Sequence, residues 1–188
     1  MRRLIYYSTV SLDGYFSGED GSLDGFVPTD EEHRYANDLV AGADAFIFGR
    51  VMYELMAYWD SEEATGPEAS AVEREFATIY RSKPRHVLSH TLTSVADERA
   101  TLVRDDIAGH VARLKAEDGG YLGLGCGSEL LAFFLEQHLI DEVRLLVLPI
   151  ALGRGVSLFG ALAEPRSFRL TSSVPTARGG LLLTYEPA

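Results

Sequence analysis

Short apolar stretches alternate with helical ones along almost the whole chain, and this alternation limits the possible folds more than any other feature. β-Branched and aromatic runs are typical of strands, whereas apolar residues at helical spacing indicate helices. The expected strands are residues 4–10, 45–48, 86–89, 100–103, 121–124, 141–150, 168–174 and 180–186, and the expected helices are residues 30–41, 51–58, 106–117 and 129–137, with a partly helical segment at 61–80. This order predicts right-handed crossovers and a mostly parallel sheet with both faces covered.

The last two expected strands, 168–174 and 180–186, are separated by a short turn that contains proline and glycine, so we expect them to be antiparallel. The sequence contains no internal repeat, low-complexity tract or linker. A length of 188 residues suits one domain with one sizeable core. We therefore predict a single three-layer α/β domain over residues 1–188, with a mostly parallel central sheet and antiparallel C-terminal strands.

Charge and composition exclude several classes of protein. A formal net charge of −11 leaves no general basic field for nucleic acid or anionic lipid. No apolar stretch reaches the roughly 20 residues of a membrane helix, and the apolar run after Met1-Arg2-Arg3 lacks a cleavage pattern, so we expect neither a membrane span nor a signal peptide. The one cysteine, Cys126, excludes an internal disulfide, and the cytoplasm is the expected compartment.

Three glycine-containing turns follow strands, at the positions where an α/β sheet binds its ligands. They are Gly49-Arg50, residues 123–128 and residues 152–155. Glycine lets backbone N–H groups approach phosphate oxygens at a helix N-terminus, and Arg50 adds a planar cation suited to phosphate. Two such helix starts suit a pyrophosphate better than a single phosphate. Backbone geometry alone also explains each glycine, and neither a G-x-G-x-x-G fingerprint nor a P-loop is present.

Taken together, these segments resemble the dihydrofolate-reductase-like superfamily, in particular bacterial proteins similar to the C-terminal reductase domain of the riboflavin-biosynthesis deaminase-reductase. The resemblance is carried by residues 11–16 (SLDGYF), 48–54 (FGRVMYE), 86–92 (HVLSHTL), 125–131 (GCGSELL) and 139–159. These five segments are spread over most of the chain, from residue 11 to residue 159. They are specific for fold and family but not for substrate.

The resemblance implies a reductase that uses NADPH or NADH and acts on a small C=N or carbonyl substrate, similar to 5-amino-6-(5-phosphoribosylamino)uracil reductase. It implies a pyrophosphate held at one helix start by Gly49, Arg50, Val51 and Met52, and at another by Gly125, Cys126, Gly127, Ser128, Glu129 and Leu130. It further implies an adenosine ribose near Ser89, His90 and Thr91, a mobile loop with Leu12, Asp13 and Gly14 over the nicotinamide, and a substrate side that includes Pro149 and Gly153.

Two positions depart from the family pattern. The glycine turn is commonly Gly-Gly followed by a small residue, whereas this chain has Gly125-Cys126-Gly127-Ser128. The cysteine side chain must point away from a pyrophosphate, which predicts weaker cofactor binding. His90 stands where an arginine often neutralises a 2′-phosphate, and histidine is mostly neutral at pH 7. NADPH is the expected cofactor, and NADH stays open.

Hydride transfer needs alignment, a dry pocket and a proton source. Asp13 is the first candidate to contact the substrate or to supply a proton, if necessary through water, although an Asp-Gly pair is also a common turn. Phe16, Tyr53 and Trp59 are candidates for an aromatic wall against a flat ring, with core packing as the alternative. The acidic residues at 30–32 are explained by helix capping and the helix dipole, so we do not expect a folate-specific role.

No metal is expected. His86 and His90 lie four residues apart on an expected strand, which separates them by about 13 Å, too far to share an ion. Cys126 has no adjacent histidine that would activate it as a nucleophile. Packing or turn geometry explains it better.

Three functional hypotheses remain. The first is an NAD(P)H-dependent reductase, with Asp13 at the reacting end. The second is a non-catalytic protein that retains the nucleotide site, and the third is a phosphosugar- or nucleotide-binding α/β protein that uses residues 125–128 as a monophosphate cup. A homodimer is expected because helix 130–135 and strand 145–150 are strongly apolar, although core packing explains both.

Overall fold

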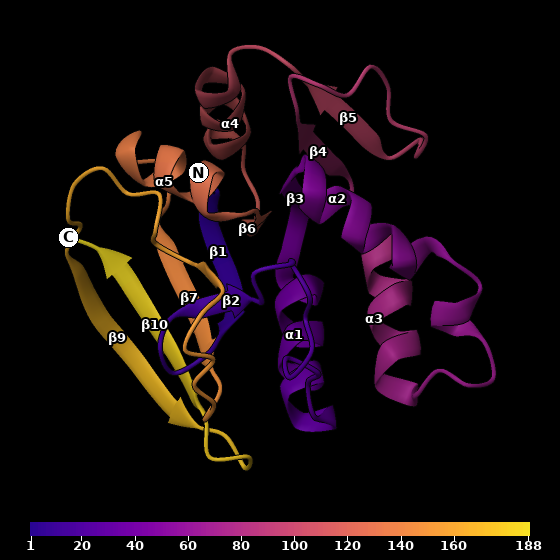
Figure 1. Cartoon of the computed structure of the whole chain (residues 1–188). Helices are drawn as coiled ribbons and strands as arrows, with labels where there is room; N and C mark the ends of the chain where they lie inside the picture. The colour runs from indigo at the N-terminus through magenta and orange to yellow at the C-terminus, as the bar shows by residue number, and fades with distance from the viewer. The chain divides into compact units, whose positions relative to one another are not determined.

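The computed structural model describes residues 1–188 and divides into two compact units (Figure 1). The first unit contains Met1–Arg3 and Asp30–Cys126, and the second contains Leu4–Thr29 and Gly127–Ala188. The prediction of a single domain over 1–188 stays a prediction.

The first unit is built on four parallel strands in the order β5-β4-β3-β6. The strands are β3 (Ala43–Gly49), β4 (Arg85–Leu88), β5 (Ala100–Val103) and β6 (Tyr121–Gly125). The helices are α1 (Asp30–Gly42), α2 (Arg50–Met56), α3 (Ala71–Arg81) and α4 (Ile107–Ala116), with short 3-10 helices at Ala57–Asp60 and Glu63–Thr65. Helices α1 and α3 pack side by side (Figure 1).

The core of the first unit is mostly aromatic. Phe46 and Phe48 stack on β3, and Tyr80 of α3 lies against both rings. Helix α3 is held in place by a capping box, in which the Ser70 hydroxyl accepts from the Glu73 N–H and the Glu73 carboxylate accepts from the Ser70 N–H. Both interactions satisfy N–H groups that a helix start leaves without a partner.

The second unit contains β1 (Arg3–Val10), β7 (Glu142–Val147), β10 (Leu181–Pro187) and β9 (Phe168–Pro175), neighbours in that order. Strands β1 and β7 are parallel, whereas β10 runs antiparallel to both β7 and β9 (Figure 1). A second, two-stranded sheet pairs β2 (Tyr15–Ser17) with β8 (Val156–Ser157). Helix α5 (Ser128–Glu136) buries its apolar face, which includes Leu131, Ala132, Phe134 and Leu135.

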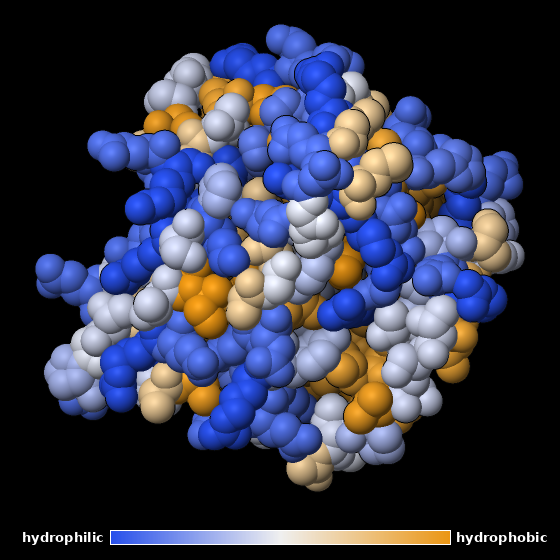
Figure 2. Space-filling model, turned by 180° about the vertical axis from the view of Figure 1, so that it is seen from behind, coloured by the Kyte–Doolittle hydropathy of each residue, from blue (hydrophilic) through white to orange (hydrophobic).

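The strand β9 differs from the other long strands because most of its residues are exposed. Leu170 and Val174 are each 50% exposed, and Leu181 of β10 is 42% exposed. Seen from behind, most of the surface is hydrophilic, and hydrophobic side chains form several small separate groups on it (Figure 2). Apolar side chains of this hairpin therefore stay partly in contact with solvent.

The structure confirms the predicted fold class, an α/β fold with mostly parallel strands and antiparallel C-terminal strands. The segment 61–80 is partly helical, as predicted, and its α-helix begins at Ala71. Two details of the prediction were wrong, because the strand expected to reach residue 150 ends at Val147 and because β2 and β8 were not predicted. Strands of two and three residues are too short to show a periodic pattern. No helix combines the length and the apolar composition that crossing a bilayer requires.

Candidate functional site

Three of the predicted cofactor-binding segments of the first unit lie at one edge of its sheet. Phe48 of β3 pairs with Val87 of β4 on one side and with Gly125 of β6 on the other. Since the three strands are parallel, the turns that follow them meet at the edge formed by their carboxyl ends. The structure therefore brings Gly49, Ser89 and Gly125 to the same edge of this sheet.

The first of these turns leads directly into α2. Gly49 is the N-cap residue, with extended backbone and no side-chain cap. Arg50 does not point an unpaired guanidinium at this turn, because its Nη1 donates to both carboxylate oxygens of Glu54, at 3.1 and 2.8 Å. Both side chains are about half exposed, so an incoming phosphate would compete with Glu54 for Arg50. Val51 is largely exposed, whereas Met52 packs against the aromatic core.

The second turn, after β4, is organised by the buried hydroxyl of Ser89. Its oxygen accepts hydrogen bonds from the N–H groups of Thr91 (3.2 Å) and Leu92 (3.0 Å). Arg104, directly after β5, lies against the same turn and donates to the backbone oxygens of His90 (2.9 Å) and Leu92 (2.6 Å). The exposed guanidinium of Arg104 thus stands beside exposed His90.

Sequence reasoning missed Arg104. One signal could have found it, since an arginine that follows a strand at the carboxyl edge of a parallel sheet points to anion binding. The register confirms its place, because Val103 of β5 pairs with Leu88 of β4.

The third turn follows β6 and has a structural reason for its first glycine. A Cβ atom at Gly125 would lie 3.0 Å from both Met52 and Phe48, which is tighter than normal packing. The Cys126 side chain is buried, only 3% exposed, and burial raises the pKa of its thiol. The thiol is therefore neutral and directed inward, so Cys126 offers a ligand only its backbone, as the sequence predicted.

In the second unit, the start of α5 is open. Gly127 is its N-cap residue, without a side-chain cap, and no atom lies within 4 Å of the position that a Cβ would occupy. The first N–H groups of a helix have no partner inside the helix, and here they belong to the predicted binding residues Ser128, Glu129 and Leu130. A helix start of this kind attracts anions, although the carboxylate of Glu129 already supplies one negative charge in the first turn.

Asp13 is the hydrogen-bonded centre of the loop after β1. Its carboxylate accepts from the Ser11 hydroxyl (2.7 Å) and from the N–H groups of Leu152 (3.1 Å) and Gly153 (2.8 Å). The Ser11 hydrogen bond, followed by that from Gly153, lowers the pKa of Asp13 to about 2. Asp13 is consequently ionised at neutral pH. Its hydrogen bonds connect the loop after β1 to the segment that contains the predicted residue Gly153.

Further hydrogen bonds hold the same loop. The Leu12 N–H donates to the Ile150 oxygen (2.7 Å), next to Pro149, and the Leu158 N–H donates to the Gly14 oxygen (3.0 Å). Together with the β2–β8 pairing, these contacts fasten the loop predicted to be mobile to the chain segment 150–158.

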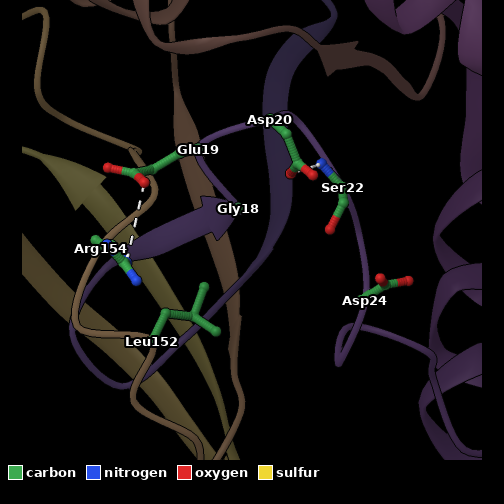
Figure 3. A pocket seen from close by; sticks show the side chains of 7 residues that line it. All are labelled: Gly18, Glu19, Asp20, Ser22, Asp24, Leu152 and Arg154. Carbon is green, nitrogen blue, oxygen red and sulfur yellow. Dashed lines mark hydrogen bonds and ion pairs between the residues drawn. The ribbon is translucent and has the colours of Figure 1, made fainter.

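A surface hollow of about 490 Å³ lies beside this loop (Figure 3). Its rim carries three carboxylates and one guanidinium, and Arg154 pairs with Glu19 at 3.9 Å. A net negative lining disfavours phosphate. The lining residues are Gly18, Glu19, Asp20, Ser22, Asp24, Leu152 and Arg154.

Two of the three predicted aromatic substrate contacts belong to the first unit and one belongs to the second. Tyr53 and Trp59 are partly buried against the aromatic core of the first unit, where the Trp59 ring lies 4.4 Å from that of Phe76. Phe16 belongs to β2 in the second unit. For Tyr53 and Trp59 the structure supports the alternative of core packing.

A model of the RibD C-terminal domain family matches residues 2–182. The chain is similar to the uncharacterized Bacillus subtilis (strain 168) proteins YyaP and YwjB. It is 27% identical to YyaP over 98% of this chain and 95% of that protein. It is 30% identical to YwjB over 90% of this chain and 89% of that protein.

Solved structures with the same fold include a putative riboflavin biosynthesis protein from Shewanella sp. PV-4, with a TM-score of 0.75, 28% identity and 99% coverage of both chains. A Thermotoga maritima deaminase/5-amino-6-(5-phosphoribosylamino)uracil reductase matches all of this chain and 57% of its own, with a TM-score of 0.68 and 15% identity. Dihydrofolate reductase from Enterococcus faecalis, complexed with NADP(H), has a TM-score of 0.66 at 12% identity, over 98% of this chain and 96% of that one.

Proposed function

Because this chain belongs to the RibD C-terminal domain family, we propose that it is an NAD(P)H-dependent reductase that transfers hydride to a small heterocyclic C=N or carbonyl substrate. The observation that carries the proposal is the carboxyl edge of the first unit, where the turns after β3, β4 and β6 meet. A bound dinucleotide would supply the hydride. The protein's part is to hold it, align it with the substrate and keep water away.

The cofactor-binding residues are proposed segment by segment. Gly49 to Met52, and the open start of α5 from Gly127 to Leu130, would offer backbone N–H groups to the pyrophosphate. Arg50 would give up one of its two hydrogen bonds to the Glu54 carboxylate and donate to a phosphate oxygen instead. Ser89 and Thr91 would lie near the adenosine ribose.

We favour NADPH over NADH because of Arg104. In similar proteins an arginine often follows the position of Ser89, whereas this chain has His90 there. Arg104 nevertheless brings a guanidinium to the same turn. A permanently charged guanidinium binds a phosphate through charge-assisted hydrogen bonds.

In the proposed reaction Asp13 does not supply the proton. A carboxyl group with a pKa of about 2 is ionised at neutral pH and can only accept hydrogen bonds. Asp13 would instead position the segment around Gly153 on the substrate side, and solvent would deliver the proton. The negative lining of the hollow beside this loop favours a substrate whose neighbouring part is neutral or cationic.

The experiment is a titration of the purified protein with NADPH and NADH, followed by cofactor fluorescence and calorimetry and repeated on Arg50→Ala. We expect micromolar binding, weakened in the variant by about 1–3 kcal/mol, the scale of a lost charge-assisted contact. Absence of binding of both dinucleotides at millimolar concentration would contradict the proposal.

A second candidate is a non-catalytic nucleotide-binding protein. It is favoured by Asp13, whose carboxylate is already engaged with three donors. Oxidation of NADPH in the presence of pyrimidine, pterin, ketone or imine substrates separates the two. Tight cofactor binding without turnover of any substrate class would support the second candidate.

A further inference from the structure

His86 and His110 form a pair that the proposed reductase function does not use. His86 lies on β4 and His110 on α4, both within the first unit. The Nε2 atom of His110 is 3.1 Å from the Nδ1 atom of His86, and the two ring centroids are 4.9 Å apart. Both side chains are partly buried and retain contact with solvent. The sequence comparison of His86 with His90 missed this pair, because it joins a strand to a helix.

The charge state of the pair suits a cation. Burial is the largest cause of a lowered pKa for both His86 and His110, and it favours the neutral form of each ring, which offers a ring-nitrogen lone pair. The carboxylate of Glu117 raises the pKa of His86, and the guanidinium of Arg2 lowers it. In the same way, Asp106 raises the pKa of His110 and Arg113 lowers it. The carboxylate of Glu117 binds Arg2 at 3.1 Å and is half exposed. Its negative charge acts on the His86 ring and would partly compensate a positive ion there.

The distances fit two ligands of one ion. Zinc binds imidazole nitrogen at about 2.0–2.1 Å, so two nitrogens at a tetrahedral angle lie about 3.3 Å apart. The observed 3.1 Å is within a few tenths of an ångström of this separation, and binding would also rotate the two rings so that both nitrogens point at the ion. We propose that His86 and His110 form a two-histidine site for a borderline divalent cation such as Zn²⁺, with water at its remaining positions.

Binding needs a rearrangement of protons but no net loss of one. In the neutral pair one ring donates its N–H to the other. When the ion binds, the donor ring moves that proton to its second nitrogen, and both facing nitrogens become ligands. Below the pKa values of the pair, protons compete with the ion. Occupancy would join β4 to α4 and stabilise the first unit by mass action.

The test is a Zn²⁺ titration of protein without a histidine tag, in competition with a chromophoric chelator. We expect one equivalent to bind at pH 7.5, affinity to fall at least about tenfold in His86→Gln and in His110→Gln, and affinity in the wild type to weaken as the pH is lowered, because protons compete with the ion. His138→Asn is the matched control. It removes an exposed histidine elsewhere, and asparagine tolerates the positive φ of 52° found there. The control should bind like the wild type.

A second measurement does not depend on the folding of the variants. In the wild-type protein, the imidazole nitrogen resonances of His86 and His110 should shift together as Zn²⁺ is added, and the melting temperature should rise. Wild-type Zn²⁺ affinity in both variants, shifts of other histidines only, or no binding at 1 mM Zn²⁺ would overturn the site and leave the pair a hydrogen bond. NADPH binding is measured separately on His110→Gln, so failure here leaves the proposed function untouched.

Discussion

Asp13 shows how one side chain fixes the loop on which substrate binding is proposed to depend. Its low pKa has a defined consequence for stability. The folded state favours the ionised form, so the stabilisation is present above the unfolded pKa of about 3.9 and is lost as the pH falls through about 2. We expect the difference in unfolding free energy between wild type and Asp13→Ala to be constant from pH 8 to pH 5 and to shrink below pH 4.

Denaturant unfolding across this pH range measures that difference, with Asp20→Ala as an exposed control in the neighbouring loop. The result that contradicts the interpretation is a difference that changes between pH 5 and pH 8, since Asp13 would then titrate there.

Arg104 gives the second prediction at this scale. If its guanidinium binds the 2′-phosphate, Arg104→Ala should weaken NADPH binding about 10- to 100-fold, the range of a lost charge-assisted interaction, and should leave NADH binding nearly unchanged. Calorimetry with both dinucleotides measures the two effects side by side. Equal losses for NADPH and NADH would mean that Arg104 only supports the turn at His90 and Leu92.

At the scale of elements, Arg85 is the least exposed charged residue of the first unit. It is 1% exposed, pairs with Asp97 and with Asp60 (3.1 Å), and lies 4.0 Å above the Tyr80 ring. It therefore connects β4 to Tyr80 of α3, to Asp60 at the end of a 3-10 helix, and to Asp97 in the segment before β5. Breaking a buried pair by removing one partner costs about 3–5 kcal/mol.

We expect Arg85→Ala to fall near the lower end of that range, because Asp60 is 41% exposed and can be rehydrated. Chemical denaturation measures the loss. Arg85→Met keeps the apolar packing over Tyr80 and should recover part of it. A cost below 1 kcal/mol for Arg85→Ala would contradict a structural role for this network.

The elements themselves were largely predictable from sequence because their signals are local. Strand β5 begins and ends at the predicted residues 100 and 103, and α4 lies within one residue of its predicted bounds at each end. The candidate site was predictable only in part, for the same reason. Glycine turns are visible locally, but the contacts of Asp13 with Leu152, of Arg104 with His90 and of His110 with His86 join residues far apart in the sequence.

At the scale of the whole molecule, the exposed β9–β10 hairpin bears on the expected homodimer. The apolar residues of α5 expected to offer an interface are buried within the chain, whereas Leu170 and Val174 of β9 are exposed. Exposed edge strands invite pairing with another chain. We propose that a second copy pairs antiparallel with β9 about Ser172, which sets Leu170 of each copy opposite Val174 of the other without opposing like charges.

Sedimentation velocity tests this arrangement. Wild-type protein should sediment as a dimer at micromolar concentration, and Leu170→Glu should sediment as a monomer because like charges would then repeat across the two-fold axis. Leu12→Glu, a change of another exposed leucine, is the control and should remain dimeric. A monomeric wild type would exclude the dimer, and a dimeric Leu170→Glu variant would exclude this interface.

The most direct test of the central claim is nuclear magnetic resonance of ¹⁵N-labelled protein titrated with NADPH. The account predicts that backbone amides of Gly49–Met52, Ser89–Thr91 and Gly127–Leu130 shift together at a single saturable site, while those of the β9–β10 hairpin stay unchanged. Shifts confined to other segments, or no shifts at millimolar NADPH, would contradict a dinucleotide site at these turns and leave the family resemblance as a matter of fold.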